Sequence, residues 1–170
     1  MNKEKFNELL SEYIKENYLK YEPRKIISNQ EEDHILYDRL PHSIFNSAAL
    51  DGLIKSNYVD TDSWKEIAKI VDSKGMKDSD LYNKARIDRR KFSKFRNGET
   101  KLTKKEYMAM AIALELSIEE TEKILSYAGF AFSNNSYFDL IVKFCIQNGN
   151  YNFDDINTHL AEYDCKKYFL

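Results

Sequence analysis

Apolar residues recur every three or four positions along most of this chain, and no stretch alternates strictly enough to predict a β-strand. The two prolines, at positions 23 and 41, leave the rest of the chain without the strongest helix breaker. Helices are therefore predicted at residues 3–18, 43–56, 63–74, twice within 78–97, and at 103–116, 118–128, 137–147 and 153–163. We expect an all-α fold.

Local signals mark where these helices begin and end. A hydroxyl residue followed three positions later by an acid predicts a capping box. Such pairs are Ser63 with Glu66, Thr103 with Glu106, Ser117 with Glu120 and, more weakly, Ser136 with Asp139. Glycines just past a helix end favour a left-handed turn, and here they are Gly75, Gly98, Gly129 and Gly149.

The pattern also predicts how the chain is organised. Residues 103–116 are apolar on nearly all sides, as a central helix would be. The first helix carries one apolar stripe, which must pack against its own domain or against another chain; it comprises Phe6, Leu9, Leu10, Tyr13 and Ile14. Residues 19–42 are expected to form an irregular polar connection. We expect an N-terminal helical arm with its connection at 1–57 and a helical domain at 58–170.

Residues 78–98 have the pattern of a helix-turn-helix, around which the domain is organised. Asp78 is expected to cap the first helix, Ile87 to fill the turn and Asp88 to cap the second helix, which stops at Gly98. At 100° per residue, Phe92 and Phe95 share one face of the second helix. The opposite face carries Arg90, Ser93, Lys94 and Asn97, and the flanks carry Arg89, Lys91 and Arg96.

Charge is concentrated in the same region. The whole chain has a formal charge of −2, but residues 84–105 hold ten Lys or Arg against two Asp or Glu, a net of +8. The rest of the chain therefore carries −10. A local patch of this sign attracts phosphates or an acidic protein surface.

The run from Leu81 to Leu125 resembles the lambda-repressor-like (XRE) helix-turn-helix family, which implies five helices and DNA binding. A narrower resemblance, over about residues 63–165, is to a little-characterised bacterial helical module that is usually C-terminal and sometimes follows a macro domain. The segments that carry it are KGMKD (74–78), ARIDRRKFSK (85–94), AIALEL (111–116), YAGFA (127–131) and FDLIV (138–142).

Two positions depart from the pattern of DNA-binding members. Tyr82 stands where a small residue usually lets the two helices close on each other, and Arg86 stands where the turn usually has glycine. Both departures bear on DNA docking rather than on the fold. Tyr82 either packs between the two helices, which is the favoured interpretation, or stacks on an unpaired base.

No motif for catalysis, a cofactor or a metal is present, so we do not expect an enzyme. His34, His42 and His159 are far apart in the sequence, and each is expected to be a surface or lightly packed histidine rather than a ligand. The acids at 31–33 and at 154–155 are expected in a loop and in a first helical turn, where acids favour the helix dipole. The unpaired Cys145 and Cys165 and the lack of an apolar leader or spanning segment favour the cytoplasm.

The first functional hypothesis is a transcriptional regulator whose helix 88–97 enters the major groove of duplex DNA, as a homodimer on a palindromic site. Arg89, Arg90, Ser93 and Lys94 would contact bases or nearby phosphates, and Arg90 would read guanine. The predicted backbone contacts are Lys84, Arg96, Lys101, Lys104 and Lys105, and Asn97 is also predicted to belong to the nucleic-acid-binding site.

The second hypothesis is a non-catalytic adaptor or inhibitor that binds an acidic protein or a protein–RNA assembly through the same patch and the N-terminal arm. The departures at Tyr82 and Arg86 and the acidic remainder of the chain favour it. A small stand-alone version of a usually fused module would also suit a phage or mobile-element protein, for example an anti-CRISPR protein. No membrane partner is expected under either hypothesis.

Overall fold

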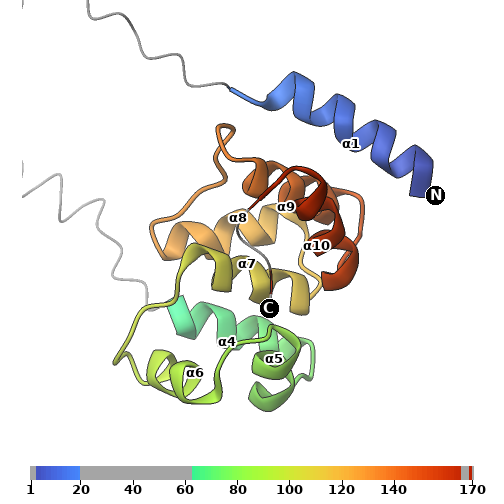
Figure 1. Cartoon of the computed structure of the whole chain (residues 1–170). Coiled ribbons are helices and arrows are strands. Elements are labelled where there is room, and N and C mark those ends of the chain that lie inside the picture. Colours follow the sequence, from blue (N-terminus) through green and yellow to red (C-terminus); the bar gives the residue numbers. More distant parts are fainter. Residues whose placement is uncertain (1–2, 20–62, 166–168, 170) are drawn as a thin grey trace, which may run out of the picture. The chain divides into compact units, whose positions relative to one another are not determined.

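The computed structural model describes residues 3–19, 63–165 and 169, and this part of the chain is all-α (Figure 1). Within these ranges there are eight helices and no strand. The helices are α1 (Lys3–Asn17), α4 (Ser63–Ser73), α5 (Asp78–Lys84), α6 (Arg89–Arg96), α7 (Lys104–Ala113), α8 (Ile118–Tyr127), α9 (Tyr137–Gln147) and α10 (Phe153–Glu162). The helix predicted at 43–56 lies outside the described residues, as does almost all of the predicted connection 19–42.

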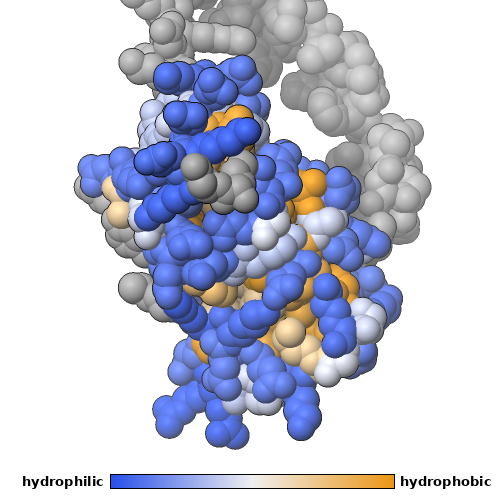
Figure 2. Space-filling view, turned by 90° about the vertical axis from the view of Figure 1, so that its right-hand side faces the viewer, coloured by the Kyte–Doolittle hydropathy of each residue, from blue (hydrophilic) through white to orange (hydrophobic). Residues whose placement is uncertain are grey.

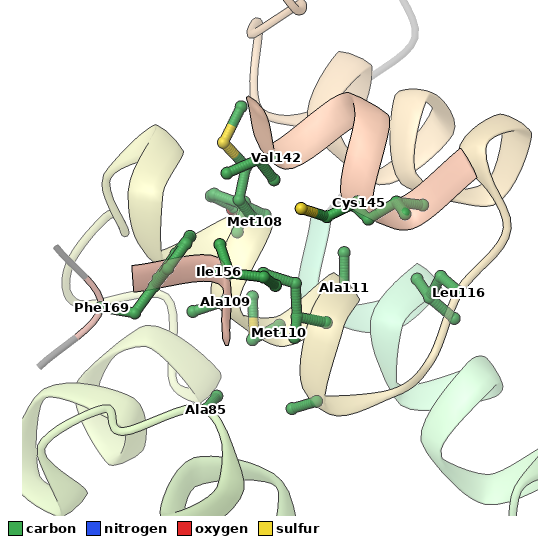
Figure 3. Close-up of a cluster of buried hydrophobic side chains, with 14 of the residues drawn as sticks. Ala85, Met108, Ala109, Met110, Ala111, Leu116, Val142, Cys145, Ile156 and Phe169 are labelled. Atoms are coloured by element: carbon green, nitrogen blue, oxygen red, sulfur yellow. The ribbon is translucent and has the colours of Figure 1, made fainter. Parts of the chain in front are cut away.

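Helix α7 is the centre of the core, as its all-round apolar pattern predicts. Every residue from Tyr107 to Leu114 is buried. The helix packs against α5 on one side and α8 on another, and its side chains meet those of α9 and α10 (Figure 3). Three small residues, Ala109, Ala111 and Ala113, allow neighbouring helices to approach closely.

All the helices from α4 to α10 end in the same turn. The residue after the C-cap donates its N–H to the carbonyl three positions back, and the next residue donates to the carbonyl five positions back, which is a Schellman motif. The left-handed residue is the predicted glycine after α4, α6, α8 and α9. After α5, α7 and α10 it is Arg86, Glu115 and Asp164, with φ of 55°, 51° and 50°. These three positions lack the glycine signal and were not predicted.

The helix starts follow the hydroxyl–acid pairs, with one exception. Thr103 with Glu106 and Ser117 with Glu120 both form complete capping boxes. Ser136 accepts a hydrogen bond from the backbone N–H of Asp139. Ser63 differs from the prediction because it is already the first residue of α4, and its hydroxyl lies 2.8 Å from the Tyr107 hydroxyl.

Helix α1 packs against α9 and belongs to the same compact unit as residues 61–170. Phe6, Leu10 and Ile14 are buried, so the apolar stripe is covered by its own chain. Leu9 was expected in that stripe but is 36% exposed. Helix α1 also covers His159, which was expected at the surface or lightly packed but is buried and stacks on the ring of Phe6 at 5.0 Å.

Candidate nucleic-acid interface

The two helices predicted within residues 78–97 are α5 and α6. Helix α5 packs against both α6 and the central α7. The N-cap of α5 is Lys77, which makes no side-chain capping bond, so the prediction of Asp78 as the cap was wrong by one residue. Asp78 instead forms an ion pair with Arg96 at 2.5 Å, which ties the start of α5 to the end of α6.

Both ends of helix α6 are capped by the residues that flank it. The Asp88 carboxylate accepts hydrogen bonds from the backbone N–H groups of Arg90 and Lys91, both at 2.9 Å, as predicted. Gly98 follows the C-cap Asn97 with φ of 76°. Because a carboxylate already occupies the first amides of α6, a ligand must be contacted by side chains of this helix rather than by its N-terminus.

Aromatic packing fixes the inner face of α6. Phe92 and Phe95 are 3% and 5% exposed, and the Trp64 ring lies edge-on to both, at 5.3 and 6.0 Å. Tyr82 is half-buried with its ring 5.6 Å from that of Phe92, and Phe95 contacts Tyr107 at 5.8 Å. Tyr82 therefore packs between α5 and α6, as the favoured interpretation expected.

The outer face of α6 carries the side chains predicted to contact a ligand. Arg89, Arg90, Ser93, Lys94 and Asn97 are all exposed. Asn97 donates a hydrogen bond to Glu99 at 3.1 Å. Within the described part of the chain, no carboxylate forms an ion pair with any of the three cations of this face. The same holds for the exposed Lys101 and the half-buried Lys105.

The other five cations of residues 84–105 are engaged in ion pairs. These pairs are Lys84 with Glu115 at 2.8 Å, Arg86 with Asp154 at 2.9 Å, Lys91 with Glu106 at 2.7 Å, Arg96 with Asp78 at 2.5 Å, and Lys104 with Asp139. All five partners lie outside the 84–105 segment. Five of the ten basic side chains in this segment therefore form ion pairs within the fold. The predicted contacts Lys84, Arg96 and Lys104 are among these five.

Lys104 is the clearest case of a cation used by the fold. Its partner Asp139 is only 5% exposed at the side chain, and the same carboxylate oxygen accepts the backbone N–H of Ser133 at 2.7 Å. Moving Lys104 to a phosphate would leave a buried carboxylate without its counter-charge. The expectation that Lys104 contacts a nucleic-acid backbone therefore conflicts with its position.

Lys91 and Glu106 connect α6 to the capping box of α7. Burial of Glu106 acts to raise its pKa, but hydrogen bonds from Lys91 and Thr103 outweigh burial, so the pKa lies below its usual value. Glu106 is therefore ionised at neutral pH. The first turn of α7 thus holds the basic helix in place by a charge-assisted hydrogen bond of 2.8 Å.

Arg86 occupies the turn with the backbone conformation that glycine would adopt. Its φ is 55°, which costs a non-glycine residue about 1–2 kcal/mol. The side chain offsets part of this cost, since it bonds to Asp154 and to the carbonyl of Phe169 and lies over the Phe153 ring at 5.2 Å. These partners are 68 and 83 residues away in sequence, so no local signal predicts them.

The acidic, histidine and cysteine side chains of the described ranges are the candidates for metal binding. No group of three or more His, Cys, Asp or Glu side chains is placed to hold a metal ion there. Burial and the charge of Asp155 raise the pKa of Cys145 to about 12, so this thiol is protonated and is a poor nucleophile. His34, His42 and the acids at 31–33 lie outside the described residues.

The described helices give no sign of a membrane span: none is both long and apolar enough to cross a bilayer. The face in Figure 2 is mainly hydrophilic, with smaller hydrophobic areas between the hydrophilic residues. Comparisons with protein-family models, with curated proteins and with solved structures found no match to this chain.

Proposed function

We propose that this chain binds nucleic acid through the outer face of α6, with duplex DNA as the ligand. One observation carries the proposal. Arg89, Arg90 and Lys94 are exposed and without an acidic partner in the described structure, on a helix whose opposite face is locked by Phe92 and Phe95. A rigid helix that presents unpaired cations is suited to enter a groove between two phosphate backbones.

The exposed side chains differ in the contacts they can make. The planar guanidinium of Arg90 can donate two hydrogen bonds to O6 and N7 of guanine. Ser93 and Lys94, on the same face, are within reach of neighbouring base edges. Arg89 on the flank, with Lys101 and Lys105 beyond the helix, suits phosphate contacts. Lys84, Arg96 and Lys104 would contribute to the long-range potential, since their own partners hold them.

The size of α6 favours a homodimer for sequence-specific binding. Eight residues span about 12 Å along the helix axis, so one copy reads only a few base pairs. Two copies on a palindromic site would double the contacts. Such an arrangement places the two recognition helices about 34 Å apart, one turn of the DNA.

The test is fluorescence anisotropy with duplex DNA, single-stranded DNA and RNA between 50 and 200 mM salt. Five unpaired cations on five phosphates predict a salt slope of about −4.5 for duplex DNA, a loss of about 500-fold over this range. The variant Arg90→Gln/Lys94→Gln should have a slope of about −2.7, a loss of about 40-fold over the same range.

A matched control separates contact from overall charge. Lys84→Gln/Arg96→Gln also removes two positive charges, but from side chains that are ion-paired. It should keep a slope near that of the unmodified chain. An equal loss of DNA affinity in the two variants would show that binding depends only on net charge. Flat anisotropy with every nucleic acid at 50 mM salt would refute the proposal.

The alternative is that the same face binds an acidic protein or a protein–RNA assembly. The closed N-terminus of α6 favours it, because Asp88 places a carboxylate where a groove-binding helix would approach a phosphate. Under this alternative, Arg90→Glu/Lys94→Glu would weaken co-purification of a defined protein partner. Neither this variant nor the unmodified chain would bind nucleic acid at low salt.

A further inference from the structure

Phe169 fills a socket at the edge of the core. Its side chain is 1% exposed and lies between the rings of Phe138 and Phe153, at 5.3 and 5.4 Å. Figure 3 shows it pointing into the side chains of α7 and α10, beside Ala109 and Ile156. A single aromatic side chain, separated from the last helix, thus completes the apolar cluster.

Side chains of the protein also bind the backbone of Phe169. The Asn157 amide accepts the N–H of Phe169 and donates to its carbonyl, both at 2.8 Å. Arg86 donates to the same carbonyl at 3.0 Å. One residue therefore has both backbone groups satisfied by side chains from two different elements. A protein that captures an extended peptide recognises its ligand in the same way, by backbone hydrogen bonds together with a side-chain pocket.

The socket is connected to the helix-turn-helix. Arg86 forms one wall, and it is the left-handed residue between α5 and α6. Next to Phe169 the surface is hollowed, with a volume of about 240 Å³. The hollow is lined by Ala85, Arg86, Lys91, Thr103, Lys105, Glu106, Ala109 and Phe169. The occupant of the socket thus lies against the turn and beside cations of the basic region.

We infer that Arg86, Asn157 and the rings of Phe138 and Phe153 form a peptide-binding site that selects an aromatic residue in an extended segment. Phe169 of the same chain is its ligand, and Phe169 of a second copy offers the same chemistry. Phe169 is held by one ring and three hydrogen bonds, so it can leave the site while the helices stay folded. Burying one phenyl ring favours the docked state by on the order of 10- to 100-fold.

The experiment measures anisotropy of a fluorescein-labelled peptide with the sequence of residues 166–170, added to the full chain without nucleic acid. The peptide should bind Phe169→Ala, and should bind the unmodified chain on the order of 10- to 100-fold more weakly because its own Phe169 competes. A peptide with Ala in place of Phe should not bind. Adding Asn157→Ala to Phe169→Ala should abolish binding.

Two results would overturn the inference: no binding of the peptide to Phe169→Ala, or equal binding after Asn157 is also replaced. If circular dichroism shows that Phe169→Ala is unfolded, Phe169→Leu takes its place. It keeps most of the buried volume but loses both ring contacts, so it should compete less and bind the peptide more tightly than the unmodified chain does. Phe132→Ala, which removes a half-buried ring from the loop before α9, should leave peptide binding unchanged.

Sedimentation equilibrium then distinguishes the source of the ligand. A monomer means that Phe169 docks in its own chain, whereas a dimer that is lost in Phe169→Ala means exchange between two copies. The peptide assay contains no nucleic acid, so its outcome is independent of the function proposed for α6.

Discussion

Replacing Lys104 with methionine measures what the Lys104–Asp139 pair contributes to stability. Methionine keeps an unbranched apolar stem but removes the charge. Asp139 would then keep its hydrogen bond from Ser133 but lose its cation, at a side chain that is 5% exposed. The stability of the fold, rather than the proposed nucleic-acid binding, is expected to decrease.

The expected loss follows from the geometry. Removing one partner of a buried ion pair costs about 3–5 kcal/mol. Here the Lys104 side chain is 26% exposed, so water can partly replace it, and the Ser133 bond remains. We therefore expect the free energy of unfolding to fall by about 2–3 kcal/mol. For a chain of this size that corresponds to a Tm lower by roughly 6–9 °C.

Urea unfolding followed by circular dichroism gives the free energy directly. Lys105→Met is the matched control, because Lys105 is the next residue of α7 and has no acidic partner in the described ranges; it should change stability by less than about 0.5 kcal/mol. In an Asp139→Asn background, Lys104→Met should cost less than about 1 kcal/mol, since an amide needs no counter-charge. Equal losses for the two lysines, or no coupling to Asp139, would refute the reasoning.

Three further changes test the anchoring of α6. Phe92→Ala should lower the free energy of unfolding by about 3–4 kcal/mol in urea, because it opens a cavity beside Trp64, and a loss under 1 kcal/mol would contradict the packing. Gly98→Ala should cost about 1–2 kcal/mol, all of it from the positive φ, since no heavy atom lies within 4 Å of the added Cβ; a neutral result would contradict the left-handed turn. Glu106→Gln should be less stable at neutral pH. Because the folded pKa of Glu106 is lowered, the stability it contributes is present above its ordinary pKa of about 4.5 and is lost as the pH falls through the lowered value. Unfolding curves of the two proteins should then converge, and a constant difference would exclude this role.

The sequence predicted best those features that local residues decide. Asp88 caps α6 through amides two and three positions away, and Thr103 and Glu106 close their box within one turn. The inner face of α6 follows from the helical period at Phe92 and Phe95. Such features need no knowledge of the tertiary structure.

The division of the basic region into paired and unpaired cations could not be predicted in the same way. Lys104 meets Asp139 across 35 residues and Arg86 meets Phe169 across 83, so both contacts depend on how the helices pack. Arg86 stands where the turn usually has glycine, but its backbone nevertheless adopts the left-handed conformation that glycine would adopt. The burial of His159 was not predicted, because Phe6 of α1, whose ring stacks on it, lies far away in the sequence.

The burial of α7 provides an internal reference for hydrogen exchange. Amides of a helix enclosed on all sides exchange with solvent only when the whole domain opens, so those of Met108 to Ala113 should report the global free energy of unfolding. Helix α6 is exposed along its outer face and is joined to α7 by the Lys91–Glu106 pair. If the amides of α6 exchange faster than those of α7, the difference gives the free energy of local opening of α6 while the core stays folded.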